Sequence, residues 1–177
     1  WQEACDGRGC SLALTGDAGI GKSRMLHWLK ERVFGDGSYV VSLYPTPETS
    51  NTPLACVLEQ LTYELPNPEA IEEKCPGFAS GDLLEELLGF QEALPVAGRQ
   101  KLRLHALVDF WLQMSQSRNF LLACDGAEHL DSLSLELISL FRERVEERPV
   151  MIVTTWRRSP AGEWGRRLEL KGLGHED

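Results

Sequence analysis

The residues best suited to chemistry lie near the start of the chain, where positions 16–23 read G-D-A-G-I-G-K-S. This is a complete G-x-x-x-x-G-K-[ST] pattern, placed between an apolar run at 11–15 and a helical pattern. Glycines let backbone N–H groups approach phosphate oxygens, and the positive end of the following helix favours an anion. The spacing therefore predicts a site for the phosphates of a nucleoside triphosphate.

The residue types of this loop indicate separate roles. Lys22 is the mobile cation for the β- and γ-phosphates, and the Ser23 hydroxyl is the expected protein ligand of Mg²⁺. The expected cofactor is ATP or ADP with Mg²⁺, although the loop does not identify the base. The predicted nucleotide-binding residues are Gly16, Asp17, Ala18, Gly19, Ile20, Gly21, Lys22, Ser23, Arg24 and Thr154.

A second candidate group is Asp125, which follows a continuous apolar run at 120–124. A run that is apolar on both faces is typical of a buried strand in a parallel sheet, and such sheets bind ligands at their carboxyl edge. An acid at this place in a phosphate-loop protein orients Mg²⁺ and its waters. We therefore expect Ser23 and Asp125 to form the metal site, the alternative being a helix cap or surface turn.

Polar residues near the end of the next predicted strand, 150–155, should reach the same edge of the sheet. Thr154, Thr155 or Arg157 would there bring a hydroxyl or guanidinium close to the γ-phosphate. The alternative is that Arg157 and Arg158 form a solvated pair.

The general base is less clearly marked. Gly126 stands where an acid often follows the metal-orienting Asp in ATPases of this class. Glu128 and Asp131 are the nearby carboxylates, and Glu128 is equally compatible with a loop acid or a helix-dipole partner. The predicted catalytic residues are Lys22, Asp125, Glu128 and Arg157.

Strands that alternate with helices must position these groups. Strands are predicted at 11–15, 39–44, 120–125 and 150–155, and helices after Ser23, from Pro53 to Leu65, around 83–88, at 104–112 and at 133–145 with Asp131 or Ser132 as N-cap. The alternation implies right-handed crossovers and a three-layer α/β/α sandwich. Trp28 and Trp111 fall on apolar helix stripes and are predicted to lie in the core, while residues 66–99 receive no role.

Composition excludes some partners. A formal charge of −9 argues against direct contact of this domain with nucleic acid or an anionic membrane. No apolar stretch approaches 18 residues, and five cysteines without metal-ligand spacing indicate free thiols in a reducing cytoplasm. Because the sequence begins at Trp1, we expect residues 1–177 to be one nucleotide-binding domain of a longer multidomain protein.

Several segments together resemble a family. Residues 16–24 resemble the G-E-A-G-I-G-K-S-R form of the signal-transduction ATPases with numerous domains (STAND), within the wider AAA+ group. Residues 125–137 are similar to the D-D-x-H-W-x-D-x-x-S-L-E-L-L segment of that family, and residues 154–157 to its T-Y-R sensor. Residues 168–173 are similar to the L-x-L-x-x-L that precedes its helical lid, and residues 52–54 to the entry to its second helix.

The resemblance implies a parallel five-stranded P-loop sheet of order 5-1-4-3-2, with the lid domain absent from this sequence. It implies that Lys22, Ser23 and Asp125 have their usual roles and that Arg157 is the sensor. Such domains serve as ATP-controlled switches in LuxR-type transcriptional regulators and in multidomain cyclases and kinases. The sequence departs from the family at Gly126 and at positions 128–129, where Glu-His replaces His-Trp.

Two functions of different class are compatible with these residues. One is a slow ATPase switch in signal transduction and transcription regulation, whose partners are the nucleotide, flanking domains of the same chain and, in a nucleotide-dependent homo-oligomer, other copies. The other is a non-hydrolysing interaction module in which the nucleotide is a structural ligand. A small-molecule kinase is a third, less favoured option because no acceptor pocket or Arg-rich lid is recognisable.

Overall fold

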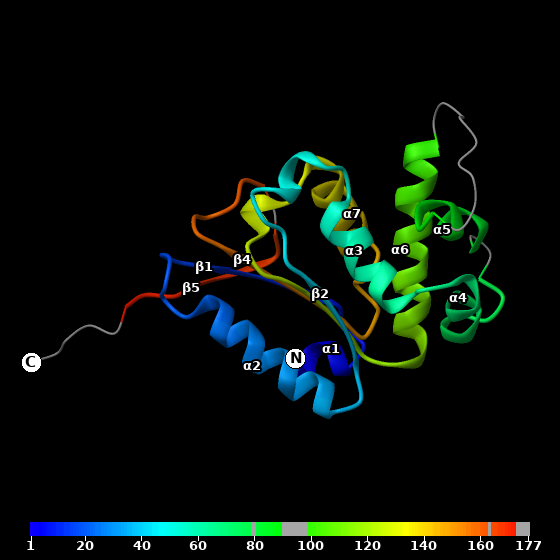
Figure 1. The fold of residues 1–177 in the computed structure, drawn as a ribbon. Coiled ribbons are helices and arrows are strands. Elements are labelled where there is room, and N and C mark those ends of the chain that lie inside the picture. Colours follow the sequence, from blue (N-terminus) through cyan, green and yellow to red (C-terminus); the bar gives the residue numbers. More distant parts are fainter. Residues whose placement is uncertain (79–80, 90–98, 163, 173–177) are drawn as a thin grey trace, which may run out of the picture.

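A single parallel sheet forms the centre of the computed structural model, which describes residues 1–78, 81–89, 99–162 and 164–172 (Figure 1). Its strands are β1 (Cys10–Thr15), β2 (Tyr39–Leu43), β3 (Phe120–Cys124), β4 (Val150–Trp156) and β5 (Arg166–Glu169). All pair in parallel, in the order β2-β3-β4-β1-β5. This is the predicted order 5-1-4-3-2 read from the other edge, and the α/β fold class is confirmed.

Helices cover both faces of the sheet. They are α1 (Gln2–Cys5), α2 (Lys22–Gly35), α3 (Ala55–Glu64), α4 (Pro68–Lys74), α5 (Gly81–Leu87), α6 (Arg99–Ser117) and α7 (Ser132–Glu143), with short 3₁₀ turns η1 (Thr49–Asn51) and η2 (Ala127–His129). Figure 1 shows α1 and α2 on one face and α3, α6 and α7 on the other, with α4 and α5 beside α6. The three predicted layers are therefore present.

The alternation of side chains along β3 separates two apolar clusters. Leu121 and Ala123 pack with residues of α1 and α2, whereas Phe120 and Leu122 pack with residues of α3, α6 and α7. Every residue of β3 is buried, as expected for a central strand with helices on both faces. Successive side chains along a strand point to opposite faces of the sheet. The position of a residue after β3 or β4 therefore decides toward which helix layer its side chain points.

The predicted elements are present, and most of their ends differ by a few residues. Asp131 is the N-cap of α7, and its carboxylate accepts hydrogen bonds from the N–H groups of Leu133 and Ser134. The helix expected from Pro53 begins at Ala55, because Leu54 has a left-handed φ of 58° that is incompatible with helix.

Two further helices were not predicted. Both α1 and α4 are short, with four and seven residues. α4 nevertheless carries a recognisable start, since the Asn67 side chain accepts a hydrogen bond from Ala70 N–H and Pro68 is the first helical residue.

The prediction for the two tryptophans is half right. Trp111 is fully buried, with its ring 5.2 Å from that of Phe141, whereas Trp28 is 62% exposed, so its assignment to the core was wrong. α2 buries one narrow stripe that contains Leu26 and Val33. Trp28 lies about 200° around the helix from Leu26, on the side away from the sheet.

The five cysteines are free thiols, as predicted. Burial raises the pKa of each of them, to about 11 for Cys56 and Cys75, so the thiols stay protonated at neutral pH.

None of the helices in the described ranges combines the length and the hydropathy that crossing a bilayer requires.

The different burial of the two tryptophans predicts different stability effects. Trp111→Ala should lower the free energy of unfolding by about 3–5 kcal/mol, because it leaves a cavity in the core. Trp28→Ala should change it by only about 0.5 kcal/mol, because the ring is already largely in water. Urea unfolding followed by circular dichroism measures both, and equal losses would contradict the placement of α2.

Candidate functional site

The loop between β1 and α2 has the backbone geometry of an anion-binding nest. Gly16, Gly19 and Gly21 have φ values of 146°, 80° and 104°, which other residues rarely adopt. At Gly16 a Cβ atom would lie only 2.7 Å from the carbonyl oxygen of Leu170. Gly21 is the N-cap of α2, so the first N–H groups of the helix have no carbonyl partner within the helix and are available to an anion.

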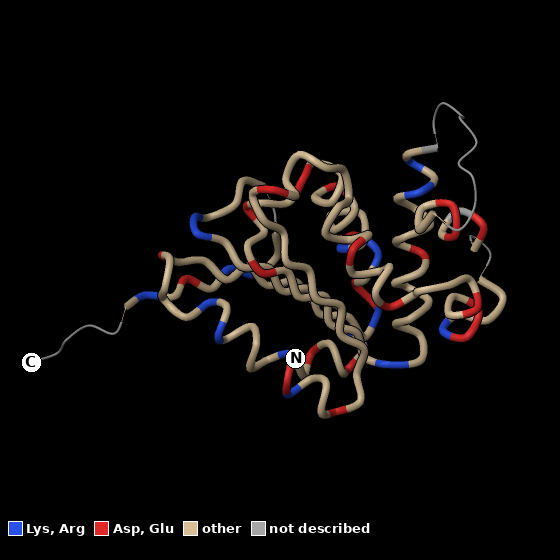
Figure 2. The backbone as a smooth tube through the Cα atoms, viewed as in Figure 1, with Lys and Arg blue, Asp and Glu red and all other residues tan. Residues whose placement is uncertain are grey.

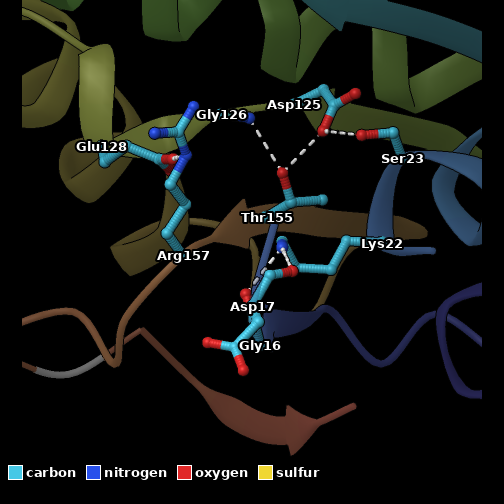
Figure 3. Close-up of polar contacts among 9 residues, drawn as sticks. All are labelled: Gly16, Asp17, Lys22, Ser23, Asp125, Gly126, Glu128, Thr155 and Arg157. Atoms are coloured by element: carbon cyan, nitrogen blue, oxygen red, sulfur yellow. Dashed lines mark hydrogen bonds and ion pairs between the residues drawn. The ribbon is translucent and has the colours of Figure 1, made fainter. Parts of the chain in front are cut away.

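The Lys22 side chain folds back across this loop. Its ammonium Nζ donates hydrogen bonds to the carbonyl oxygens of Gly16 and Asp17, at 2.6 and 2.7 Å (Figure 3). The residue is buried although it carries a charge. The cation is thus already held among the backbone groups where phosphate oxygens would bind, and a phosphate can replace the two carbonyls as its partner.

Ser23 and Asp125, the two predicted metal ligands, lie in hydrogen-bond contact. The Ser23 hydroxyl donates to Asp125 Oδ1 at 3.0 Å (Figure 3). The Asp125 backbone N–H donates to the carbonyl of Leu43 at 3.0 Å. The backbone bond fixes Asp125 at the carboxyl edge of the sheet, beyond the last residue of β3.

These two side chains fit Mg²⁺ in company with a nucleotide. A hydroxyl and a carboxylate are hard oxygen ligands, and Mg²⁺ takes one or two such groups together with phosphates and waters. Within the described ranges, no group of three or more His, Cys, Asp or Glu residues is arranged to hold a metal by itself. The pair Ser23 and Asp125 would therefore hold Mg²⁺ jointly with the phosphates.

The two threonines at the end of β4 differ in direction. Thr155 Oγ1 donates to Asp125 Oδ1 at 2.7 Å and accepts the N–H of Gly126 at 2.8 Å (Figure 3). The Thr154 hydroxyl accepts the indole N–H of Trp156 at 2.8 Å, and Trp156 packs in the cluster on the other face. Thr154, which we predicted to bind nucleotide, thus points away from Asp125.

The register of β3 against β4 would have distinguished Thr154 from Thr155. Cys124 pairs with Thr154, so Asp125 and Thr155 each follow one residue later and point toward the same face. Leu121 and Ala123 share that face with α2. The acid, the Thr155 hydroxyl and the phosphate loop therefore meet on one side of the sheet.

The candidate base and the candidate sensor are paired with each other. Arg157 Nε lies 3.2 Å from Glu128 Oε1 (Figure 3). The Arg157 side chain is 65% exposed, and Glu128 lies in the short turn η2 that follows Gly126. Asp131, the other nearby carboxylate, is occupied as the N-cap of α7.

A cleft of about 720 Å³ adjoins the phosphate loop. It is lined by Thr15, Gly16, Asp17, Ile20, Arg157, Arg158, Ser159, Arg167, Glu169, Leu170, Lys171 and Gly172. Four of these residues are basic and two are acidic, so the lining has a net positive charge in a chain whose net charge is −9. Figure 2 shows the basic and acidic positions along the whole backbone. The Arg167 guanidinium donates to Ser159 Oγ and to the Gly162 carbonyl, which fixes one wall. Such a cleft attracts an anion and has room for the parts of a nucleotide beyond its phosphates.

The remaining predicted residues lie on the rim of the loop. Ala18 and Gly19 are exposed at its tip, and Arg24 is exposed in the first turn of α2.

Comparison with known families agrees with this geometry. The family model described as AAA ATPase domain matches residues 1–153. The chain belongs to this family. The matched segment contains the phosphate loop, Asp125 and all but the last three residues of β4. The comparison with curated proteins gave no match.

Family membership makes this a nucleotide-binding P-loop domain of the AAA type, whose nucleotide is typically bound with Mg²⁺.

Removing the Lys22 ammonium should weaken ATP binding. The lost charge-assisted hydrogen bonds correspond to about 1.5–3 kcal/mol, so Lys22→Ala should raise the Kd for ATP by about 10- to 150-fold. Lys30→Ala is the matched control, because Lys30 lies on the same helix but contacts Tyr44 instead of the loop. Isothermal titration calorimetry measures both, and equal affinity of wild type and Lys22→Ala would refute the assignment of the loop.

Proposed function

We propose that this domain is the ATP-dependent switch of a longer signal-transduction protein, and that it binds Mg-ATP or ADP and hydrolyses ATP slowly. Its nucleotide state would set the arrangement of flanking domains, in transcription regulation or in a related signalling output. One observation carries the slow turnover: Gly126 follows Asp125, while Lys22 contacts the phosphate loop and Ser23 contacts Asp125.

Gly126 is built into the turn. Its φ of 89° lies in the left-handed region, and its N–H is bound to Thr155. The chain therefore has no carboxylate directly beside Asp125 to position the attacking water. A positioned general base typically contributes about 10²–10⁴-fold to a rate, so its absence favours slow hydrolysis.

The ion pair between Glu128 and Arg157 has to open before either residue can take part in hydrolysis. While Arg157 holds Glu128, the carboxylate is not free to position water and the guanidinium is not free to contact a γ-phosphate. An exposed ion pair is worth only about 0–1 kcal/mol, so an ATP γ-phosphate can compete for Arg157 and release Glu128. ADP lacks the γ-phosphate and would leave the pair intact.

The alternative is a non-hydrolysing module in which ATP or ADP is a structural ligand. The same residue, Gly126, supports it, because a site without a base binds nucleotide without consuming it. In either case the partners we propose are flanking domains of the same protein and further copies of the chain. The five free thiols suit a reducing compartment such as the cytoplasm.

Restoring an acid at position 126 should accelerate hydrolysis. Gly126→Asp supplies the missing carboxylate, and a Cβ atom here would lie 3.6 Å from the nearest heavy atom outside its chain neighbours, an ordinary contact. The matched control is Gly126→Asn, which has the same shape and adopts the left-handed conformation at similar cost. Single-turnover hydrolysis in the full-length protein should be at least about tenfold faster for Asp than for Asn.

The same assay decides between the two functions. Slow hydrolysis by wild type that falls further in Glu128→Gln supports a slow ATPase that uses Glu128. Complete absence of turnover with intact ATP binding, in the wild type and in every variant, supports the non-hydrolysing module. Rapid wild-type hydrolysis that survives Glu128→Gln would contradict both.

A further inference from the structure

The hydroxyl of Thr155 is the buried member of the network around Asp125. Thr155 is 1% exposed and belongs to β4, so the sheet holds its position. The other donor to Asp125 Oδ1 is the hydroxyl of Ser23, which is exposed and belongs to the phosphate loop and the start of α2. Only the Thr155 bond is therefore independent of the state of the loop.

The direction of the Thr155 proton is fixed by its neighbours. A hydroxyl has one proton to donate, and the Gly126 N–H already occupies an acceptor position on Thr155 Oγ1 at 2.8 Å. The proton is then directed to Asp125 Oδ1, 2.7 Å away. Both hydrogen bonds to the Asp125 carboxylate fall on Oδ1, and Oδ2 accepts none from the residues that the structure describes.

We propose that Thr155 is a positioning residue, which holds Asp125 Oδ1 from the sheet so that Oδ2 faces the Mg²⁺ of a bound nucleotide. Thr155 does not touch the nucleotide and acts only through Asp125. The proposal rests on the proposed function and gives Thr155, which the sequence suggested as a hydroxyl close to the γ-phosphate, a role through Asp125 instead. It follows that the hydroxyl of Thr155 should matter for binding in the presence of Mg²⁺ and hardly at all in its absence.

The neighbouring residue provides an internal control. Thr154 is also 1% exposed, and its hydroxyl accepts a single hydrogen bond, from Trp156 on the opposite face, whereas the Thr155 hydroxyl makes two. Thr154→Val and Thr155→Val therefore remove equally buried hydroxyls one residue apart, and Thr155→Val additionally leaves the Gly126 N–H without its acceptor. Only the second should change the response to metal.

The experiment is titration calorimetry of the whole chain with the non-hydrolysable analogue AMP-PNP, once in excess Mg²⁺ and once in EDTA. In Mg²⁺, Thr155→Val should bind about 5- to 10-fold more weakly than wild type, the loss expected for one typical hydrogen bond. In EDTA the two should agree within about twofold. Thr155→Ser should restore Mg²⁺-dependent binding, Thr155→Ala should behave as Thr155→Val, and Thr154→Val should match wild type in both conditions.

Each other result has a definite meaning. If the Val variants of Thr154 and Thr155 respond alike to Mg²⁺, Thr155 has a structural role only and the proposal is overturned. If Thr155→Val does not fold, Thr155→Ala takes its place, because it removes the hydroxyl without adding a methyl group. A wild-type response of Thr155→Ala to Mg²⁺ then overturns the proposal as well. Failure of wild type to bind AMP-PNP in either condition would instead refute the proposed nucleotide switch, and the role of Thr155 with it.

Discussion

The hydrogen bond from Ser23 to Asp125 joins two residues 102 positions apart, and the site depends on it. It can form only because β4 lies between β1 and β3 in the sheet and all three strands run in parallel. Their carboxyl ends then meet at one edge, where α2 begins. At this edge the hydroxyl of Thr155, on the middle strand, bonds to Asp125. The geometry of the metal site and the phosphate loop therefore depends on the order of the strands in the sheet.

The two faces of the sheet differ in the side chains that they carry. The face with α3, α6 and α7 carries the larger apolar cluster, which is mainly aliphatic and includes aromatic side chains such as Phe120 and Phe141. On the face with α2, the apolar cluster is small, and polar groups at its edge are satisfied by one another. Buried polar groups that are hydrogen-bonded cost little, whereas unpaired ones cost about 1–3 kcal/mol. The ordered network thus lets an acid stand next to a fully buried strand.

Much of this arrangement could be predicted from local sequence patterns. The phosphate loop and the Ser23–Asp125 pair follow from residue types that ligand chemistry restricts, and β3 and β4 follow from continuous apolar runs. The direction of Thr154 could not be assigned without the register of β3 against β4, since one residue of shift reverses the face. Trp28 was misplaced because α2 buries too narrow a stripe for the pattern to define its edge. The pairing of Glu128 with Arg157 depends on loop conformation, which short-range patterns do not determine.

The most direct test of the account is the Mg²⁺ dependence of ATP affinity in Asp125→Asn. The substitution keeps the shape of the side chain and removes the charge that faces the metal. Titration calorimetry of wild type and variant, each in Mg²⁺ and in EDTA, compares the two losses in one set of measurements. The account predicts that Asp125→Asn loses more affinity in Mg²⁺ than in EDTA. Equal losses in the two conditions would show that Asp125 is a structural cap at the end of β3 and would contradict the metal site.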